Sequence, residues 1–155
     1  MIKVFGLQRT GTNYLWCLLT DNFSVDAPYL AIDPNFGVHD FDVENIVDPY
    51  EKCYVLRRNI DDWVSAILSN PDYKGVRDLK IKHGNLNEAA LRNLHVQYES
   101  FWDTLSSSKN NVGPKVVRVN FEDISNDPTT FLDNLSYTKL NDKWTIRNKT
   151  DTPFA

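Results

Sequence analysis

A short stretch near the start of the chain combines glycines, hydroxyl side chains and one arginine in a pattern that suits anion binding. Residues 6–13 read GLQRTGTN, and they lie between a short apolar run and an amphipathic segment. This order predicts a strand, a tight loop and a helix, so that backbone N–H groups gather at the positive end of the helix dipole. Gly6 allows a sharp turn, and Gly11 allows the backbone to approach an anion closely. The stretch is therefore a candidate cradle for phosphate or sulfate.

The side chains of this loop add further donors. Arg9 supplies a forked cation. Hydroxyl or amide donors come from Thr10, Thr12 and Asn13. The nucleotide triphosphate motif is G-x-x-x-x-G-K-[ST], in which the lysine binds phosphate and the serine or threonine holds Mg²⁺. Here Thr12 occupies the position of that lysine, and Asn13 occupies the position of the serine or threonine. The loop is thus poorly equipped for ATP hydrolysis, and we expect it to bind the phosphate of a donor without a metal ion.

Charged side chains also follow two other apolar runs. Arg57 ends the run 52–57, and Glu122 follows the run 115–121. Strands that alternate with helices predict an α/β fold with a mainly parallel central sheet, in which ligands bind at the carboxyl ends of the strands. We therefore expect Arg9, Arg57 and Glu122 to converge on one edge of the sheet.

Helices must hold these strand ends in place. Helical periodicity predicts helices over 11–22, 59–68 and 87–106 and a short helix over 127–135, with Asn59 as a good N-cap. Their apolar stripes are Leu15, Leu18, Leu19 and Phe23; then Ile60, Trp63, Val64, Ile67 and Leu68; then Leu91, Leu94, Tyr98, Phe101 or Trp102, and Leu105.

Other polar positions lie outside these stripes. Ser65 faces the side of its helix that a ligand could reach, and His95 is expected at the surface. Residues 70–86 are polar and locally basic, which indicates either a lid or substrate loop or a solvated surface loop. Residues 139–155 form a polar C-terminal segment.

Composition limits the classes of protein that fit. The 155 residues are 41% hydrophobic and 25% charged, which predicts one globular domain over 1–155. A net charge of −4 argues against non-specific nucleic-acid binding. No apolar run approaches ~18 residues, so we expect no membrane insertion and a cytoplasmic protein. Cys17 and Cys53 are expected to be buried, reduced thiols, and no Cys/His spacing predicts a metal site.

The first loop and the Arg57 segment together resemble the sulfotransferases that use 3′-phosphoadenosine 5′-phosphosulfate (PAPS). Arg9, Thr10, Gly11 and Thr12 match that family's Lys/Arg-[ST]-Gly-[ST] loop. Arg57, Asp61 and Ser65 have the spacing of its second signature. A weaker similarity covers residues 119–128, where a strand and an acidic pair precede Asp-Pro.

The resemblance implies a three-layer fold like that of P-loop NTPases, and it implies roles for individual residues. Arg9 and the loop residues Thr10, Gly11, Thr12 and Asn13 would hold the 5′-phosphosulfate. Arg57 and Ser65 would hold the 3′-phosphate. A late basic pair, Arg147 and Lys149, would serve the same phosphate, although a solvated tail explains that pair equally well.

His39 is the candidate catalytic base by the same resemblance, with Asp33 and Asp40 as alternatives. Family members commonly carry a lysine next to this histidine, but Val38 precedes it here. Either another cation (Lys3, Arg9 or Arg58) substitutes for that lysine, or the activity is weaker. An imidazole near its ordinary pKa suits base catalysis at neutral pH.

These expectations define a metal-free transfer of a sulfuryl group from PAPS to a hydroxyl or amine, with 3′,5′-adenosine bisphosphate (PAP) as product. The acceptor is a small molecule or a glycan; a sugar, a phenol, a lipid headgroup and a peptide tyrosine all stay open. Two alternatives stand beside this hypothesis: a small-molecule or nucleotide kinase, and a binding module that keeps the fold without the chemistry.

Overall fold

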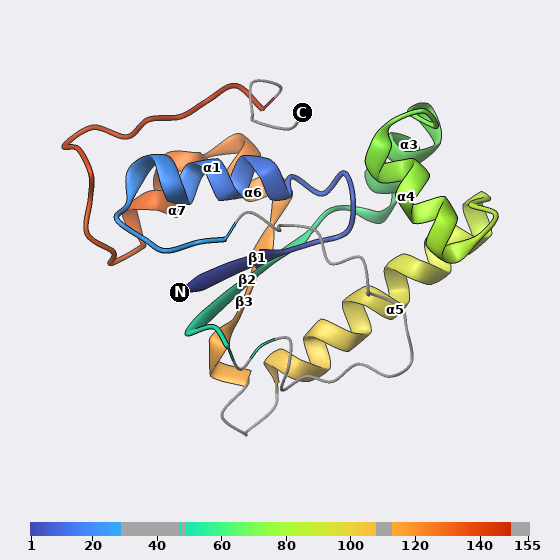
Figure 1. The fold of residues 1–155 in the computed structure, drawn as a ribbon, viewed down its shortest axis with the longest axis horizontal. Coiled ribbons are helices and arrows are strands. Elements are labelled where there is room, and N and C mark those ends of the chain that lie inside the picture. The colour runs from blue at the N-terminus through green and yellow to red at the C-terminus, as the bar shows by residue number, and fades with distance from the viewer. Residues whose placement is uncertain (29–46, 48, 108–112, 150–155) are drawn as a thin grey trace.

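Three short parallel strands form the centre of the protein, and helices cover both faces of the sheet (Figure 1). The computed structural model describes residues 1–28, 47, 49–107 and 113–149. The elements in chain order are β1 (Ile2–Phe5), α1 (Thr12–Asn22), β2 (Lys52–Arg57), α3 (Ile60–Ser69), α4 (Lys74–His83), α5 (Glu88–Ser106), the 3₁₀ turn η1 (Gly113–Lys115), β3 (Val116–Asn120), α6 (Phe121–Asn126) and α7 (Pro128–Asp133).

The strands lie in the order β1-β2-β3, and both pairings are parallel. β1 pairs with β2 from Ile2 opposite Lys52 to Phe5 opposite Val55. β2 pairs with β3 as far as Arg57 opposite Asn120. Because the strands run in one direction, their carboxyl ends meet at one edge, as the alternating pattern predicts. The mixed α/β class with a parallel sheet is thus confirmed.

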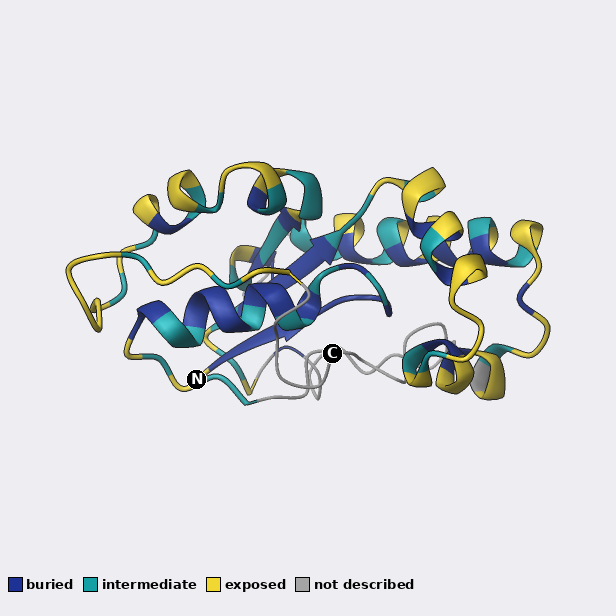
Figure 2. Cartoon of the chain, turned by 90° about the horizontal axis from the view of Figure 1, so that it is seen from above, coloured by how far each residue is buried: buried dark blue, intermediate teal, exposed yellow. Residues whose placement is uncertain are grey.

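Each face of the sheet carries its own hydrophobic cluster. α1, α6 and α7 cover one face, where apolar side chains of α1 pack on Ile2, Val4 and Leu56. α3, α4 and α5 cover the other, where Trp63 and Trp102 pack with Phe5 and Val55. Figure 2 shows the result: the strands and the inner sides of these helices are buried, and their outer sides are exposed.

Helix ends follow local chemistry. The side chain of Asn59 accepts from the N–H groups of Asp61 and Asp62, and that of Asn87 accepts from Ala90 N–H. Asp127 caps α7 in the same way. These caps satisfy N–H groups that a helix cannot pair internally. Gly11 precedes α1 and offers no side-chain cap, so the first amides of that helix lack this kind of partner.

Several sequence-based expectations are corrected. Residues 74–83 of the predicted polar loop 70–86 form helix α4, with Val76 and Leu79 buried beneath an exposed polar side. The apolar run at the start of the chain forms a strand only as far as Phe5, so residues 6–11 form the loop. The predicted short helix over 127–135 is present as α7, and an additional short helix, α6, precedes it. Leu68 is 48% exposed rather than part of the buried stripe of α3.

The segment after α7 runs along the C-terminal end of α1. Lys139 and Phe23 form an isolated antiparallel β-bridge. The Asn22 side chain donates to the Thr145 carbonyl and accepts from the Thr145 N–H. Trp144 packs against Phe23 with ring centroids 5.4 Å apart. Residues 139–147 are therefore attached to the end of α1, although most of their side chains are exposed.

Two further expectations concern whole-chain properties. Cys17 and Cys53 are buried thiols outside any disulfide, as predicted. Among the described residues, every helix is too short or too polar to cross a bilayer. His39, Asp33 and Asp40 lie outside the described residues, so the prediction of a catalytic base stays a prediction.

Candidate functional site

The loop between β1 and α1 alternates in backbone handedness. Arg9 has φ 66° and Gly11 has φ 89°, whereas Thr10 between them has a negative φ. Arg9 is the one non-glycine residue with positive φ in the described part of the chain. Alternation of this kind turns successive N–H groups towards one concavity, the arrangement known as an anion nest. The loop also sits at the N-terminus of α1, where the helix dipole is positive.

The carbonyl groups of the loop are bonded to the protein on the other side. Thr10 Oγ1 donates to the Leu7 carbonyl at 2.6 Å. The Gln8 carbonyl accepts from Trp63 Nε1, and the Arg9 carbonyl accepts from Arg58 Nη1, both at 2.7 Å. In contrast, the amides of residues 9, 11 and 12 donate to no backbone carbonyl among the described residues. The loop is therefore fixed to the protein through its carbonyl groups.

Both glycines of the loop are required by close contacts. A Cβ on Gly6 would lie 2.5 Å from Thr12 Cγ2 and 2.6 Å from Thr10 Oγ1. A Cβ on Gly11 would lie 2.4 Å from the ring of Phe121, at a positive φ that already disfavours other residues. The atoms that approach Gly11 belong to Phe121, and the expectation that this glycine lets the backbone approach an anion stays a prediction.

Cations gather around this loop although the chain as a whole is acidic. The Arg9 guanidinium lies 4.8 Å from the ring centre of Tyr73. The Arg58 guanidinium lies 4.9 Å from that of Phe121, and Lys149 Nζ lies 5.9 Å from the same ring. Burial lowers the pKa of Arg58, and nearby Arg9 lowers it further, against the opposing effect of Asp62. An anion bound here would relieve the repulsion between these cations.

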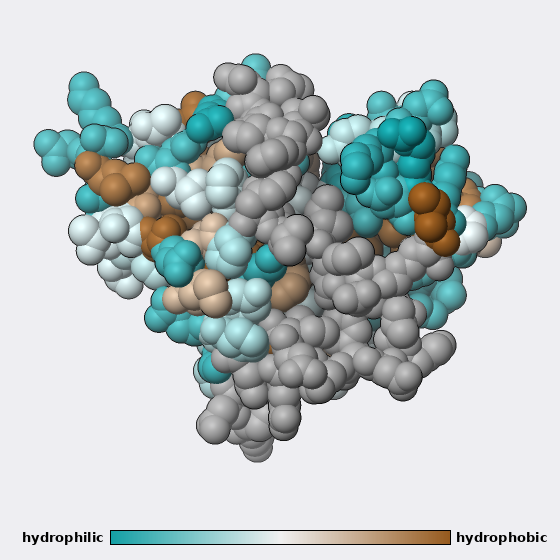
Figure 3. Space-filling model, in the orientation of Figure 1, coloured by the Kyte–Doolittle hydropathy of each residue, from teal (hydrophilic) through white to brown (hydrophobic). Residues whose placement is uncertain are grey.

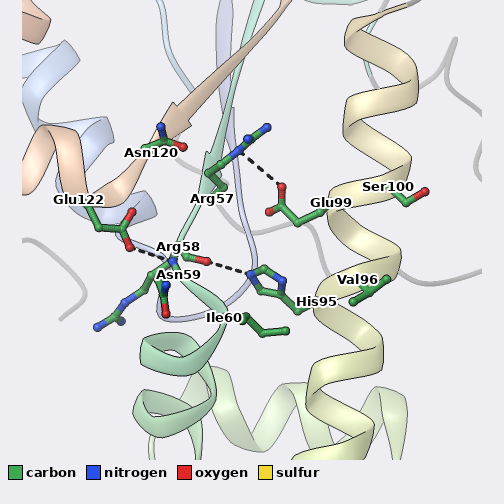
Figure 4. A pocket seen from close by; sticks show the side chains of 10 residues that line it. All are labelled: Arg57, Arg58, Asn59, Ile60, His95, Val96, Glu99, Ser100, Asn120 and Glu122. Atoms are coloured by element: carbon green, nitrogen blue, oxygen red, sulfur yellow. Dashed lines mark hydrogen bonds and ion pairs between the residues drawn. The ribbon is translucent and has the colours of Figure 1, made fainter.

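Arg57 enters a different environment. Its Nη2 donates to Asp103 Oδ1 at 2.8 Å, and its Nε lies 3.5 Å from Glu99 Oε2. The side chain is 36% exposed and lines an open pocket of about 650 Å³ at the carboxyl ends of β2 and β3. Figure 4 shows the residues of this pocket: Arg57, Arg58, Asn59, Ile60, His95, Val96, Glu99, Ser100, Asn120 and Glu122.

Glu122 reaches the same edge of the sheet. Its Oε1 accepts from the backbone N–H of Asn59 at 2.8 Å, so a carboxylate sits at the start of α3 (Figure 4). Arg57 and Glu122 therefore meet in one pocket, and Arg9 is joined to it through the Arg58 side chain. The predicted convergence of Arg9, Arg57 and Glu122 on one sheet edge is what the structure has.

Other predicted residues are placed less simply. Ser65 is exposed on α3 and is absent from the described lining of the pocket. Arg147 pairs with Asp21, with Nε 2.7 Å from Oδ2, in the last turns of α1 and therefore at the opposite end of that helix from the loop. Lys149 bonds Ser125 Oγ and lies near Phe121, so it is the member of the late basic pair that reaches the loop.

Some residues of the site were not assigned a role from sequence. His95, expected at the surface, is only 9% exposed; its Nε2 lies 2.9 Å from the Arg58 carbonyl and its ring 5.5 Å from that of Trp63. Trp63 was expected in the apolar stripe, but its indole N–H also holds the loop. Phe121 gave no signal at all. The Arg57-Arg58 pair at the end of β2 was a usable signal for the residues that join the loop and the pocket. Adjacent side chains of an extended chain point to opposite sides, so Arg58 reaches the loop while Arg57 reaches α5.

The space-filling view shows hydrophilic side chains over the end of the molecule where α3 and α4 lie (Figure 3). Lys74, Arg77 and Lys80 are exposed on α4. Within the described ranges, no group of three or more His, Cys, Asp or Glu side chains could hold a metal ion. Comparison of the chain with models of protein families, with curated proteins and with solved structures finds no match.

Proposed function

We propose that this protein is a sulfotransferase of the P-loop-like fold that moves a sulfuryl group from PAPS to a hydroxyl or amine of a small molecule or glycan. The observation that carries the proposal is the loop before α1. Its carbonyls are bonded to the protein, its amides at residues 9, 11 and 12 donate to no described backbone carbonyl, and Arg9, Arg58 and Lys149 surround it. Such a loop suits an anion that carries charge on several oxygens.

The surroundings of the loop fit the rest of the donor. The 5′-phosphosulfate would bind the loop amides and Arg9. The pocket beside it offers about 650 Å³, apolar contact from Ile60 and Val96, and a guanidinium from Arg57 for the 3′-phosphate. Pockets that bind small molecules commonly combine apolar walls with a few fixed polar groups. The donor would supply the sulfuryl group and leave as PAP.

The residues of the site would act by holding and orienting charge. Arg9 and the loop amides would stabilise negative charge on the phosphate side of the transferred group, since they are fixed before the ligand arrives. Arg58 would keep the loop in this shape through its 2.7 Å bond to the Arg9 carbonyl. His39 would take the proton of the acceptor, with Asp33 and Asp40 as alternatives.

Titration calorimetry with PAP and with AMP tests the donor site. Both nucleotides carry a 5′-phosphate, but only PAP carries the 3′-phosphate. We expect PAP to bind more tightly than AMP, and Arg57→Ala to remove that difference by weakening PAP alone, about 10- to 100-fold for one charged hydrogen-bonding group. Arg9→Ala should weaken both nucleotides. Arg77→Ala removes an exposed guanidinium on α4 and should change neither.

Equal affinity for PAP and AMP would contradict the proposal, and Mg²⁺-dependent binding of ATP would favour the kinase instead. Transfer from PAPS is then measured across acceptor classes. His39→Ala is expected to abolish transfer while PAP affinity stays unchanged. Donor binding without turnover on any acceptor would favour the binding module.

A further inference from the structure

Arg57 belongs to a compact cluster of two arginines and two carboxylates, which we call the arginine–carboxylate cluster. Arg57 and Arg118 come from neighbouring strands, and Glu99 and Asp103 lie four residues apart on α5. Asp103 Oδ1 accepts from Arg57 Nη2 at 2.8 Å and from Arg118 Nη1 at 3.0 Å. Glu99 Oε2 accepts from Arg118 Nη2 at 2.7 Å. The formal charges of the cluster cancel.

The two arginines of the cluster differ in exposure and in partners. The Arg118 side chain is 11% exposed and bonds both carboxylates at 3.0 Å or less. The Arg57 side chain is 36% exposed, lines the pocket, and makes one short ion pair, to Asp103. Arg118 with Glu99 therefore fastens α5 to the sheet. Glu99 also lines the pocket, but Asp103 makes the shorter ion pair with Arg57, so it is the carboxylate that holds most closely the guanidinium that an anion in the pocket would meet.

We infer that Asp103 is a positioning residue that competes with the 3′-phosphate of the donor for Arg57 and so lowers the affinity of the protein for the nucleotide. The inference rests on the proposed function, since it assumes a 3′-phosphate at Arg57. A phosphate that approaches Arg57 meets a cluster whose charges cancel, and it binds by replacing or sharing the contact with Asp103. Loss of the Asp103 charge would leave the cluster with one net positive charge facing the pocket.

The competition has a kinetic consequence. PAPS and PAP carry the same 3′-phosphate, so a residue that weakens the hold on this group weakens donor and product together. Release of product often limits turnover in enzymes. Asp103 would therefore speed release of PAP at the expense of donor affinity, and its removal would increase inhibition by the product.

Asp103→Asn tests the inference, because it removes the charge and keeps an oxygen that can accept a hydrogen bond. The Glu99–Arg118 pair still fastens α5, and Asp103 is 54% exposed, so the variant should fold. We expect PAP to bind about 3- to 10-fold more tightly at low salt, with AMP unchanged. The gain in affinity should shrink at about 0.5 M salt, because salt screens charges strongly and shortens the range of their interaction. Asp78→Asn is the matched control, since Asp78 is 51% exposed and forms a 3.0 Å ion pair with Lys74 on α4.

The outcomes separate the two hypotheses. Tighter PAP binding by Asp103→Asn with unchanged AMP binding supports competition. If the variant binds PAP more weakly, as Arg57→Ala should, Asp103 holds Arg57 in place for the ligand and the inference is wrong. Unchanged PAP affinity also overturns it. If the wild-type protein does not distinguish PAP from AMP, the proposed function itself fails. Glu99→Gln is expected to lower the thermal midpoint because the half-buried Arg118 loses the charge of its nearest carboxylate, 2.7 Å away.

Discussion

At Gly11 two constraints meet in one residue. The backbone has φ 89°, and the Phe121 ring lies where a side chain would begin. The spacing of the glycines in the loop was visible in the sequence, but the contact with Phe121 was not, because it joins residues 110 positions apart. The same limit applies to His95, whose polar type suggested the surface while its actual partner is the Arg58 carbonyl.

Gly11→Ala is expected to lower the free energy of unfolding by about 2–4 kcal/mol. Roughly 1 kcal/mol comes from the left-handed backbone, and the remainder comes from overlap with the ring. Urea unfolding measures the sum, and a double-mutant cycle with Phe121→Ala separates the two causes. In the Phe121→Ala background, Gly11→Ala should cost only about 1 kcal/mol. An equal cost in both backgrounds would show that the ring contact is not the cause.

Helices with strong end signals were predicted well from the sequence. α3 and α5 begin directly after Asn59 and Asn87, and both asparagine side chains accept backbone N–H groups there. α4 was missed because its signals are weak. The first turn of α4 has no side-chain cap and contains Gly75. Val76 and Leu79 supply the buried apolar side chains of this helix. Packing against the rest of the structure, rather than local preference, decides such a helix.

The cap of α5 can be tested away from the pocket. Asn87→Ala is expected to cost about 1 kcal/mol of stability, because the Ala90 N–H loses its acceptor. Urea unfolding gives the value. Asn85→Ala, at an exposed position two residues earlier, should cost close to nothing. Equal losses in both variants would argue against the cap. PAP affinity should be the same in both, since neither residue lines the pocket.

At the scale of the whole molecule, the alternation of strands and helices was sufficient to predict a parallel sheet and the edge at which its charged strand ends meet. The order of the strands and the pairing of Arg57 with α5 were not predictable, because both depend on contacts between distant segments. The arginines at the strand ends were thus visible in the sequence, whereas the carboxylates that neutralise Arg57 come from α5, a helix whose sequence indicated only packing.

The centre of the sheet also makes stability depend on pH. Burial raises the pKa of the Cys53 thiol from 9.0 to about 12, against a smaller lowering by Lys115 and Lys3. The native protein therefore keeps this proton at pH values where the unfolded chain releases it. Stability from this group is complete below about pH 9 and is lost as pH rises towards 12. Burial also raises the pKa of Tyr54 beside it, with the same sign.

Urea unfolding between pH 7 and 11 checks this dependence. Cys53→Ala should lose less stability than the wild type as the pH rises, although it starts lower because of the cavity. Val55→Ala supplies the control, since it creates a cavity in the same strand without removing a titrating group. Parallel curves for Cys53→Ala and the wild type would contradict the assignment.

The attachment of residues 139–149 to α1 bears on the order in which the protein can fold during its synthesis. α1 precedes this segment by more than a hundred residues, and Asn22, Asp21 and Phe23 each have a partner in it. The contacts around the C-terminal end of α1 therefore form only after residues 139–149 have been synthesised, however early the helix itself forms.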